Sequence, residues 1–276
     1  MHELYSHDVG VQQQAAGALA NLAVNADIQV KVAEAGAIPP LVALLRPQCS
    51  ARVQEQAARA LKNLSFNAAN KVKVALAGAI PPLVALLGPQ SSVGVQEQAA
   101  GAIWRLAFND DNKVKFATAG AIPPLVALLG PQSSPGVQEQ VARVLMNLAI
   151  NDDNQVKIVA AGAIPPLVVL LGPQNSVRVQ ELAVGALWSL AANAENQVKV
   201  ALAGAIPPLV ALLGPQNSMG VQEQAAGALR NLSINAGNKV LIRSSWGVAA
   251  LTKLLHSSPS DEVKSVAREA LDMINS

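Results

Sequence analysis

The heptapeptide Gly-Ala-Ile-Pro-Pro-Leu-Val at residues 78–84 decides the fold, because it returns at a fixed interval. Residues 78–119 share 30 identities in 42 positions with residues 120–161. A degenerate copy, Gly-Val-Ala-Ala-Leu from Gly247, follows 43 residues after the last full copy. Self-similarity at a fixed period of this length predicts a repeat architecture. The full copies, 42 residues apart, begin at Gly36, Gly78, Gly120, Gly162 and Gly204.

Working outward from this heptapeptide, each period predicts three helices. A short first helix, Asn70–Leu76, follows an asparagine start signal and stops at Gly78, a residue that favours the left-handed conformation. The second begins at the proline pair, where the missing N–H groups cost nothing, and ends at Gly88. The third covers about 93–108 and carries apolar residues at three- and four-residue spacing. No segment alternates as a half-buried strand does, so the predicted fold class is all-α.

The three patterns GAIPPLVALL, VQEQAAGAL-x-N-L and N-x-x-N-x-V-K cover essentially the whole chain and resemble those of the armadillo-repeat family. The stretch Asn-Leu-Ser-Ile-Asn-x-x-Asn-Lys at residues 231–239 is most similar to plant and algal members. The resemblance implies a right-handed α-solenoid of three-helix, 42-residue armadillo repeats, with the third helices lining a concave groove. HEAT repeats are the structural alternative, but they lack the recurring glycines at the helix ends and the short additional helix.

The period also predicts the organisation of the chain, a single armadillo-repeat domain over residues 1–276. It opens with a lone third helix at 8–25 and closes with a C-terminal capping repeat at 237–276, where charged residues replace apolar ones. The full repeats between them cover about 27–67, 69–109, 111–151, 153–193 and 195–235.

Composition excludes several classes of protein. The chain is 51% hydrophobic and 14% charged, with a net charge of +2, which does not fit a disordered protein. Cys49 is its single cysteine, so a disulfide scaffold is excluded. The uncharged apolar runs of about 15 residues fall short of the roughly 20 that a membrane span needs. Residues 1–10 show no signal peptide. We therefore expect a cytoplasmic or nuclear protein.

Catalytic motifs are absent from the sequence. The three histidines lie at the two ends of the chain, which argues against a metal cluster or a histidine relay. Cys49 stands where other copies carry serine or asparagine, and we expect it to be an inert replacement. We therefore predict no enzyme, no catalytic residue, no metal site and no cofactor.

The internal copies differ mainly on one stripe of the third helix, at four recurring positions. A constant scaffold with a variable stripe indicates a binding surface. The first row is Gly17, Arg59, Gly101, Arg143, Gly185 and Gly227; the second row is Ala20, Lys62, Trp104, Met146, Trp188 and Arg230; the third row is Asn21, Asn63, Arg105, Asn147, Ser189 and Asn231; the fourth row is Val24, Phe66, Phe108, Ile150, Ala192 and Ile234.

The third row matches the asparagine ladder of the armadillo family. In that family the ladder hydrogen-bonds the backbone of an extended peptide, and an amide can donate and accept at once. The resemblance implies this role for Asn21, Asn63, Asn147 and Asn231, whereas Arg105 and Ser189 interrupt the ladder. The alternative is that these amides only brace neighbouring third helices. A second asparagine set, four residues later, is predicted to cap the end of the third helix in the left-handed conformation: Asn25, Asn67, Asn109, Asn151, Asn193 and Asn235.

The stripe is basic and partly aromatic. Its predicted basic residues are Arg59, Lys62, Arg105, Arg143 and Arg230. We expect them to favour an acidic segment, although they could instead pair with a glutamate row at the groove edge: Glu55, Glu97, Glu139, Glu181 and Glu223. Trp104, Phe108, Met146 and Trp188 are the predicted apolar contacts, of which Phe108 could instead be tucked under the following repeat.

These observations predict a non-enzymatic scaffold that binds an extended or disordered, acidic segment of a protein partner. An engineered or homogenised array without a selected ligand is the first alternative, given the repeat identity. A nuclear-import adaptor for basic signals is the second, but that group carries tryptophan where this chain has the first row. We expect neither a membrane nor nucleic acid as a partner. The unpaired first helix leaves an apolar edge that admits end-to-end self-association.

Overall fold

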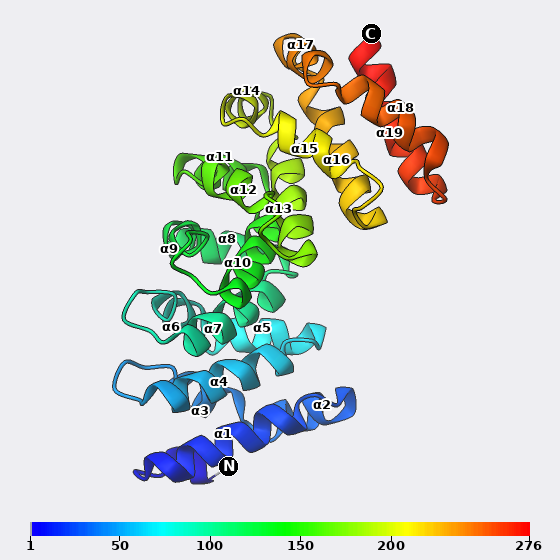
Figure 1. The fold of residues 1–276 in the computed structure, drawn as a ribbon. Coiled ribbons are helices and arrows are strands. Elements are labelled where there is room, and N and C mark those ends of the chain that lie inside the picture. Colours follow the sequence, from blue (N-terminus) through cyan, green and yellow to red (C-terminus); the bar gives the residue numbers. More distant parts are fainter. Residues whose placement is uncertain (1) are drawn as a thin grey trace. The chain divides into compact units, whose positions relative to one another are not determined.

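A computed structural model describes residues 2–276, which form helices and contain no strand (Figure 1). A short 3₁₀ helix, η1 (His2–Tyr5), precedes the repeats, and Met1 lies outside the described residues. The third helices of the repeats are α1 (Val9–Leu22), α4 (Ala51–Leu64), α7 (Val93–Leu106), α10 (Pro135–Leu148), α13 (Val177–Leu190), α16 (Met219–Leu232) and α19 (Asp261–Asn275).

The other two helices of each repeat are shorter. The first helices are α2 (Ala26–Glu34), α5 (Ala68–Leu76), α8 (Asp110–Thr118), α11 (Asp152–Ala160), α14 (Ala194–Leu202) and α17 (Ala236–Ser244). The second helices are α3 (Ile38–Ala43), α6 (Ile80–Ala85), α9 (Ile122–Ala127), α12 (Ile164–Leu170), α15 (Ile206–Leu212) and α18 (Gly247–Ser257).

Glycine stops each first helix as the sequence predicts. Gly36, Gly78, Gly120, Gly162 and Gly204 all have φ between 77° and 82°. The last repeat differs, because Trp246 takes the corresponding place with φ 64°. The period is therefore 42 residues there as well, and the 43-residue offset assigned to Gly247 comes from aligning the wrong residue.

The recurring asparagines are caps, but not of the predicted kind. Asn25, Asn67, Asn109, Asn151, Asn193 and Asn235 have extended backbone with φ between −73° and −93°. Their Oδ1 atoms accept backbone N–H groups of the following first helix, as Asn67 does from Asn70 at 3.1 Å. They therefore start the first helix rather than close the third, because an N-cap needs an extended residue with a side-chain acceptor.

The third helices α4, α7, α10, α13 and α16 are each anchored at their start by two side chains. Ser92 caps α7 by accepting the N–H of Val95, and Gln96 donates through Nε2 to the Gly88 carbonyl at 2.9 Å. The same glutamine bond recurs from Gln54, Gln138, Gln180 and Gln222. The loop between the second and third helices is thereby fixed to the third helix.

The core lies on the predicted face of the third helix. Val95, Ala99, Ala102, Ile103 and Leu106 are all fully buried. Burial of these side chains supplies the main stabilisation, at about 25 cal/mol per Å² of apolar surface.

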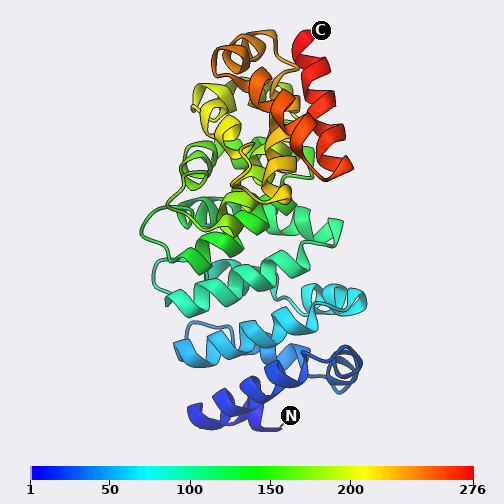
Figure 2. The ribbon, with the colours of Figure 1, turned by 45° about the vertical axis from the view of Figure 1, so that its right-hand side comes forward.

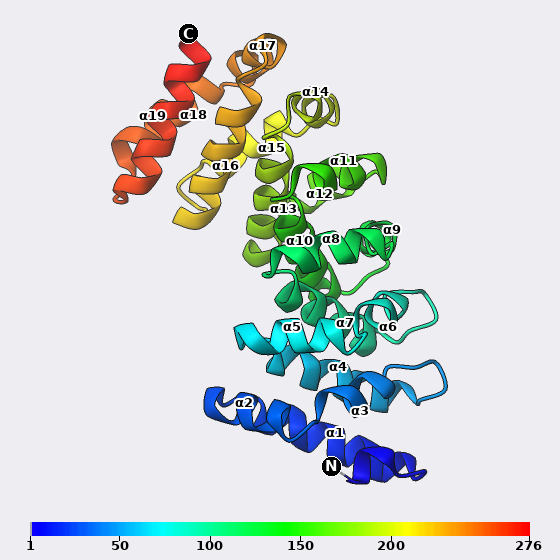
Figure 3. The same ribbon diagram turned by 180° about the vertical axis from the view of Figure 1, so that it is seen from behind.

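The described chain divides into two compact units, Met1–Asn147 and Leu148–Ser276. In the first unit α1 packs on α4 and α4 on α7, side by side (Figure 2). In the second unit α13 packs on α16 and α16 on α19 (Figure 3). The assignment of the whole chain to a single domain stays a prediction.

Candidate functional site

Neighbouring third helices meet through residues 39 positions apart, one repeat less one helical turn. The second-row residue of one copy lies against the first-row residue of the next. The Lys62 stem lies over Gly101, where a Cβ would be 2.8 Å from Lys62 Cδ. The Trp188 indole covers Gly227 in the same way, with 2.7 Å from a Cβ to Cε2. Gly101 and Gly227 are therefore not open slots, because a side chain of the preceding copy fills the space above each of them.

In the first unit, residues 39 positions apart place arginine side chains against aromatic rings. The Cζ of Arg105 lies 3.5 Å from the ring centroid of Phe66 and 4.0 Å from that of Trp104. The Cζ of Arg143 lies 4.4 Å from the centroid of Trp104. Phe108 meets Trp104 edge to face at 5.5 Å. We call Phe66, Trp104, Arg105, Phe108 and Arg143 the basic–aromatic cluster.

The two cations of this cluster differ in their other contacts. Arg143 pairs with Glu139 at 2.6 Å. Within the described residues, the Arg105 guanidinium forms no hydrogen bond and no ion pair. Arg105 is therefore held by the faces of two rings, an interaction worth about 0.5–2 kcal/mol.

Positive charge is concentrated around the cluster. Burial lowers the pKa of Lys62; Glu97 opposes this shift, and the positive charges of Arg59, Arg105 and Arg143 add to it. Burial also lowers the pKa of Arg105, with Arg143 contributing. Lys62 donates to Gln98 at 2.6 Å, and Arg59 donates to Asn21 at 2.9 Å. The first unit thus gathers four of the five predicted basic residues near one another.

The glutamate row does not lie free at the groove edge. A Cβ on Gly94 would be 2.8 Å from Glu55 Oε2, and one on Gly136 would be 2.6 Å from Glu97 Oε2. These glycines are the second residues of α7 and α10, so the carboxylates face positive helix N-termini. In the second unit, Glu181 pairs with Arg178 at 3.1 Å. Glu55 and Glu97 thus stabilise the next helix, whereas Glu139 pairs with Arg143, so the alternative pairing is present at Arg143 and leaves Arg105 without an ion pair among the described residues.

The asparagine ladder braces the third helices in part. Asn63 donates through Nδ2 to the Ala20 carbonyl at 2.8 Å, and Asn231 to the Trp188 carbonyl at 3.3 Å. Asn147 is also buried, but its Nδ2 has no hydrogen-bond partner among the described residues. The bracing alternative is thus present in the unbound protein, and the peptide contacts stay a prediction.

The second unit offers weaker features. Arg230 pairs with Glu269 at 2.5 Å, again 39 residues apart, and also contacts Asn231 Oδ1. Trp188 is half-buried by its contact with Gly227, and Met146, at the end of the first unit, is half-buried too. Phe108 is 53% exposed, so it is not tucked under the following repeat. The structure therefore brings the predicted basic and aromatic residues together in the first unit and not around Arg230.

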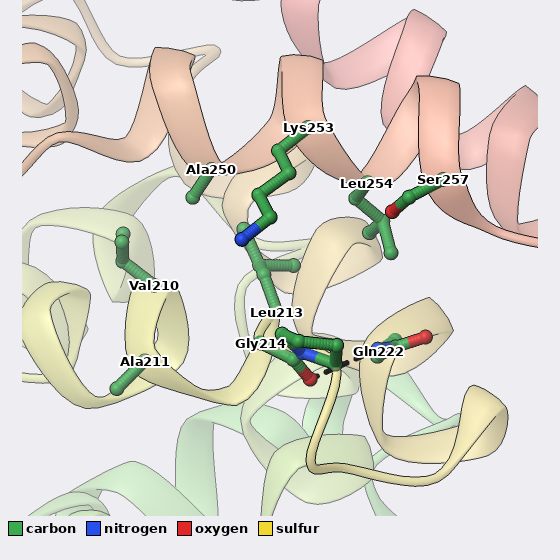
Figure 4. A pocket seen from close by; sticks show the side chains of 10 residues that line it. Val210, Ala211, Leu213, Gly214, Gln222, Ala250, Lys253, Leu254 and Ser257 are labelled. Atoms are coloured by element: carbon green, nitrogen blue, oxygen red, sulfur yellow. Dashed lines mark hydrogen bonds between the residues drawn. The ribbon is translucent and has the colours of Figure 1, made fainter.

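A second kind of concavity recurs at the loops between second and third helices. Three cavities of about 310, 400 and 220 Å³ are lined by residues that correspond across the repeats. In the last of them Lys253 of α18 reaches down beside Leu213 and Gly214, whereas the corresponding residues of the other two cavities are Ala85 and Ala127 (Figure 4). Cys49 lines the first, where burial raises the pKa of its thiol and Arg46 partly opposes this. A raised pKa makes the thiol less nucleophilic at neutral pH.

The described residues contain no group of three or more His, Cys, Asp or Glu side chains arranged to hold a metal ion. Among residues 2–276, none of the helices combines the length and apolar character that crossing a lipid bilayer requires.

Sequence reasoning found the four rows but not their contacts. It missed the 39-residue pairing, although oppositely charged residues at that interval, Arg230 and Glu269, were a usable signal. It also missed Phe66 as the partner of Arg105. The row of exposed Phe66 and Phe108 could have indicated it, since both lie one turn from a third-row residue.

Comparison with known proteins agrees with this architecture. The model of the armadillo/beta-catenin-like repeat matches residues 25–66, 67–108, 109–150, 151–192 and 193–234. Among curated proteins, none matches the chain.

Several solved structures are similar to the chain. An engineered protein is 35% identical with a TM-score of 0.91, over 99% of this chain and 66% of that one, so the chain spans less than two thirds of that protein. A designed armadillo repeat protein is 34% identical with a TM-score of 0.79, over 86% of this chain and 100% of that one. Another, in complex with the peptide (KR)4, is 33% identical with a TM-score of 0.77, over 86% and 99%. The all-α solenoid of 42-residue repeats is therefore confirmed, and the chain belongs to the armadillo/beta-catenin-like repeat family.

Proposed function

We propose that this armadillo repeat protein is a non-enzymatic scaffold that binds an extended, acidic segment of a partner protein across its third helices. The basic–aromatic cluster of the first unit is the centre of the proposed site. The proposal includes a cytoplasmic or nuclear location, where disordered acidic segments of other proteins are accessible.

The single observation that carries the proposal is the state of Arg105. Its guanidinium lies on two aromatic faces and, within the described residues, donates no hydrogen bond. A guanidinium stacked in this way keeps its in-plane N–H donors for a carboxylate, which it can bind in a bidentate manner. A partner's Asp or Glu side chain supplies that acceptor.

The surrounding charges favour an acidic rather than a basic segment. Arg59, Arg105 and Arg143 lie close enough to Lys62 to lower its pKa, and Glu97 opposes that shift only in part. A basic segment would meet like charges, whereas an acidic one would reduce their mutual repulsion. The basic peptide bound by one designed neighbour is therefore not the expected ligand here.

The ladder supports an extended backbone in the partner. Asn63 uses one N–H for bracing, and Asn147 holds a buried donor without a partner. A buried, unsatisfied N–H costs about 1–3 kcal/mol, which a partner carbonyl would relieve once the Asn147 amide turns toward the surface. An extended segment offers such carbonyls at regular spacing.

Fluorescence anisotropy with matched extended peptides tests the proposal. One peptide alternates Glu and Ala, the other Lys and Ala, and each is titrated at low and at physiological salt. We expect the acidic peptide to bind about tenfold tighter at low salt, with a smaller difference when the charges are screened. A preference for the basic peptide would contradict the proposal and favour an import adaptor.

Charge reversal locates the site. Arg105→Glu should weaken acidic-peptide binding by about tenfold while leaving helicity unchanged, because other copies carry Asn or Ser at this position. Lys73→Glu is the matched control: it changes the charge equally on α5, outside the four rows. Equal losses in the two variants would show that net charge, not the cluster, governs binding.

The second candidate is an engineered or homogenised array without a selected ligand. The 30 identities between consecutive copies and the engineered neighbours favour it. Binding of neither peptide would support this candidate over the scaffold.

A further inference from the structure

We propose that Phe66 and Trp104 form a slot for a cation that Arg105 fills from within the chain, so that Arg105 acts as an internal ligand. Emptying the slot should then let it bind an arginine side chain of a separate peptide. The inference uses the proposed function only in assuming that this surface can meet a peptide. It adds that one residue fixes which charge the surface accepts.

The geometry matches that of a bound guanidinium. The Arg105 Cζ lies 3.5 Å from the Phe66 centroid and 4.0 Å from the Trp104 centroid, which are stacking distances. The two rings come from different copies, Phe66 following α4 and Trp104 lying on α7. Phe66 is 50% exposed and Trp104 is half-buried, so a peptide side chain can reach the same space.

Arg105 is not needed to build the helix that carries it. Four other copies have asparagine at this place, and two of those amides donate to the carbonyl 43 residues earlier. By the same spacing, an asparagine at 105 would reach the Lys62 carbonyl. Arg105→Asn therefore empties the slot and restores the ladder without introducing a side chain that the fold does not already accept.

The rings keep other contacts when Arg105 is removed. Trp104 still lies against Arg143 at 4.4 Å and meets Phe108 edge to face at 5.5 Å. A slot supported in this way remains preorganised, which reduces the ordering that a ligand must impose. Its charge surroundings already accommodate one guanidinium, so a peptide arginine replaces the lost charge and adds no further one.

Anisotropy with two peptides of equal charge tests the inference. One alternates Arg and Ala and the other Lys and Ala, each with eight residues. In Arg105→Asn we expect the arginine peptide to bind about tenfold tighter than in the parent protein, and tighter than the lysine peptide. A planar guanidinium stacks on aromatic faces better than an ammonium, so the preference for arginine identifies the slot.

Two variants separate the slot from the loss of charge. Arg59→Ala removes one positive charge from the same unit, from a residue that contacts Gln56 and Asn21 and, among the described residues, no aromatic ring. Phe66→Ala, combined with Arg105→Asn, removes one wall, and the fourth row accepts alanine at Ala192. The inference is wrong if Arg59→Ala gives the same gain, or if the gain survives Phe66→Ala.

The outcome is independent of the proposed function. Failure of the parent protein to bind the acidic peptide would end the acidic-scaffold proposal and leave the gain in Arg105→Asn intact. Absence of that gain would end the slot inference, whatever the parent protein binds.

Discussion

Among the described residues that are not glycine, Trp246 alone has a positive φ. Its φ of 64° is in the left-handed region, where a Cβ costs roughly 1–2 kcal/mol. The preceding repeats place glycine at the corresponding position. The side chain is 78% exposed, so burial returns little of this cost.

Trp246→Gly should therefore raise the free energy of unfolding, by about 1 kcal/mol, because it relieves the left-handed strain and loses little packing. Urea denaturation followed by circular dichroism measures the change. Trp246→Ala keeps the Cβ and serves as the control, with little expected gain. A less stable glycine variant would show that the exposed indole contributes to the fold.

Lys62 makes stability depend on pH. Its pKa is lowered in the folded protein, first by burial, so its charge opposes folding at neutral pH. Above the ordinary lysine pKa of about 10.4 the side chain is neutral in both states, and that opposition disappears.

Lys62→Met keeps an apolar stem over Gly101 and removes the charge, and Met146 already occupies the second row. At pH 7 we expect a gain of less than about 1 kcal/mol, because the amine is partly solvated. Thermal melts from pH 7 to 10.5 should show the variant's advantage shrinking as pH rises. Lys73→Met, at an exposed position, provides the reference. A constant advantage across this range would contradict the assigned charge effect.

At the scale of the element, the third helices are joined by the 39-residue pairing rather than by one uniform side-chain type. A stem lies on glycine at Lys62 and Gly101, an indole on glycine at Trp188 and Gly227, and an ion pair closes the last contact. These contacts depend on which rotamer each side chain adopts, which a sequence pattern does not specify.

The pairing predicts different costs for the same substitution. Gly→Ala inside a helix normally stabilises by up to about 1 kcal/mol. At Gly227 the new Cβ would lie 2.7 Å from the rigid indole of Trp188, and overpacking of this kind costs about 1–3 kcal/mol. At Gly101 the neighbour is the flexible stem of Lys62, so Gly101→Ala should be near neutral. Urea midpoints compare the two, and equal midpoints would show that the indole moves aside freely.

Helix boundaries were predictable where glycine and proline set them. The left-handed glycines and the proline pairs each allow one interpretation, and the structure confirms both. The predicted end of the second helix at Gly88 is wrong, because α6 ends at Ala85. The asparagine caps were assigned to the wrong helix, because α7 ends at Leu106 and α8 begins at Asp110, so Asn109 stands beside both ends. Only the extended backbone of Asn109 shows that it caps the start of α8 and not the end of α7.

At the scale of the whole molecule, the repeat explains why the fold was predictable and the site only in part. Each repeat contacts its neighbours alone, so local signals repeated along the chain specify the architecture. The site depends on which charges are compensated. The sequence placed the glutamate row and the basic residues on one surface. In the structure Glu55 and Glu97 face helix N-termini and Glu139 pairs with Arg143, so Arg105 has no ion pair among the described residues.

The 39-residue pairing also determines how such a chain can lengthen by duplication of its own coding blocks. A tandem copy sets the second-row residue of a block beside the first-row residue of its twin. In the block with Gly185 and Trp188, the indole would meet glycine, as it does at Gly227. In the block with Arg59 and Lys62, two cations would meet. Duplication is therefore better tolerated in blocks that carry a first-row glycine. Those glycines influence which blocks can be duplicated as well as how neighbouring helices pack.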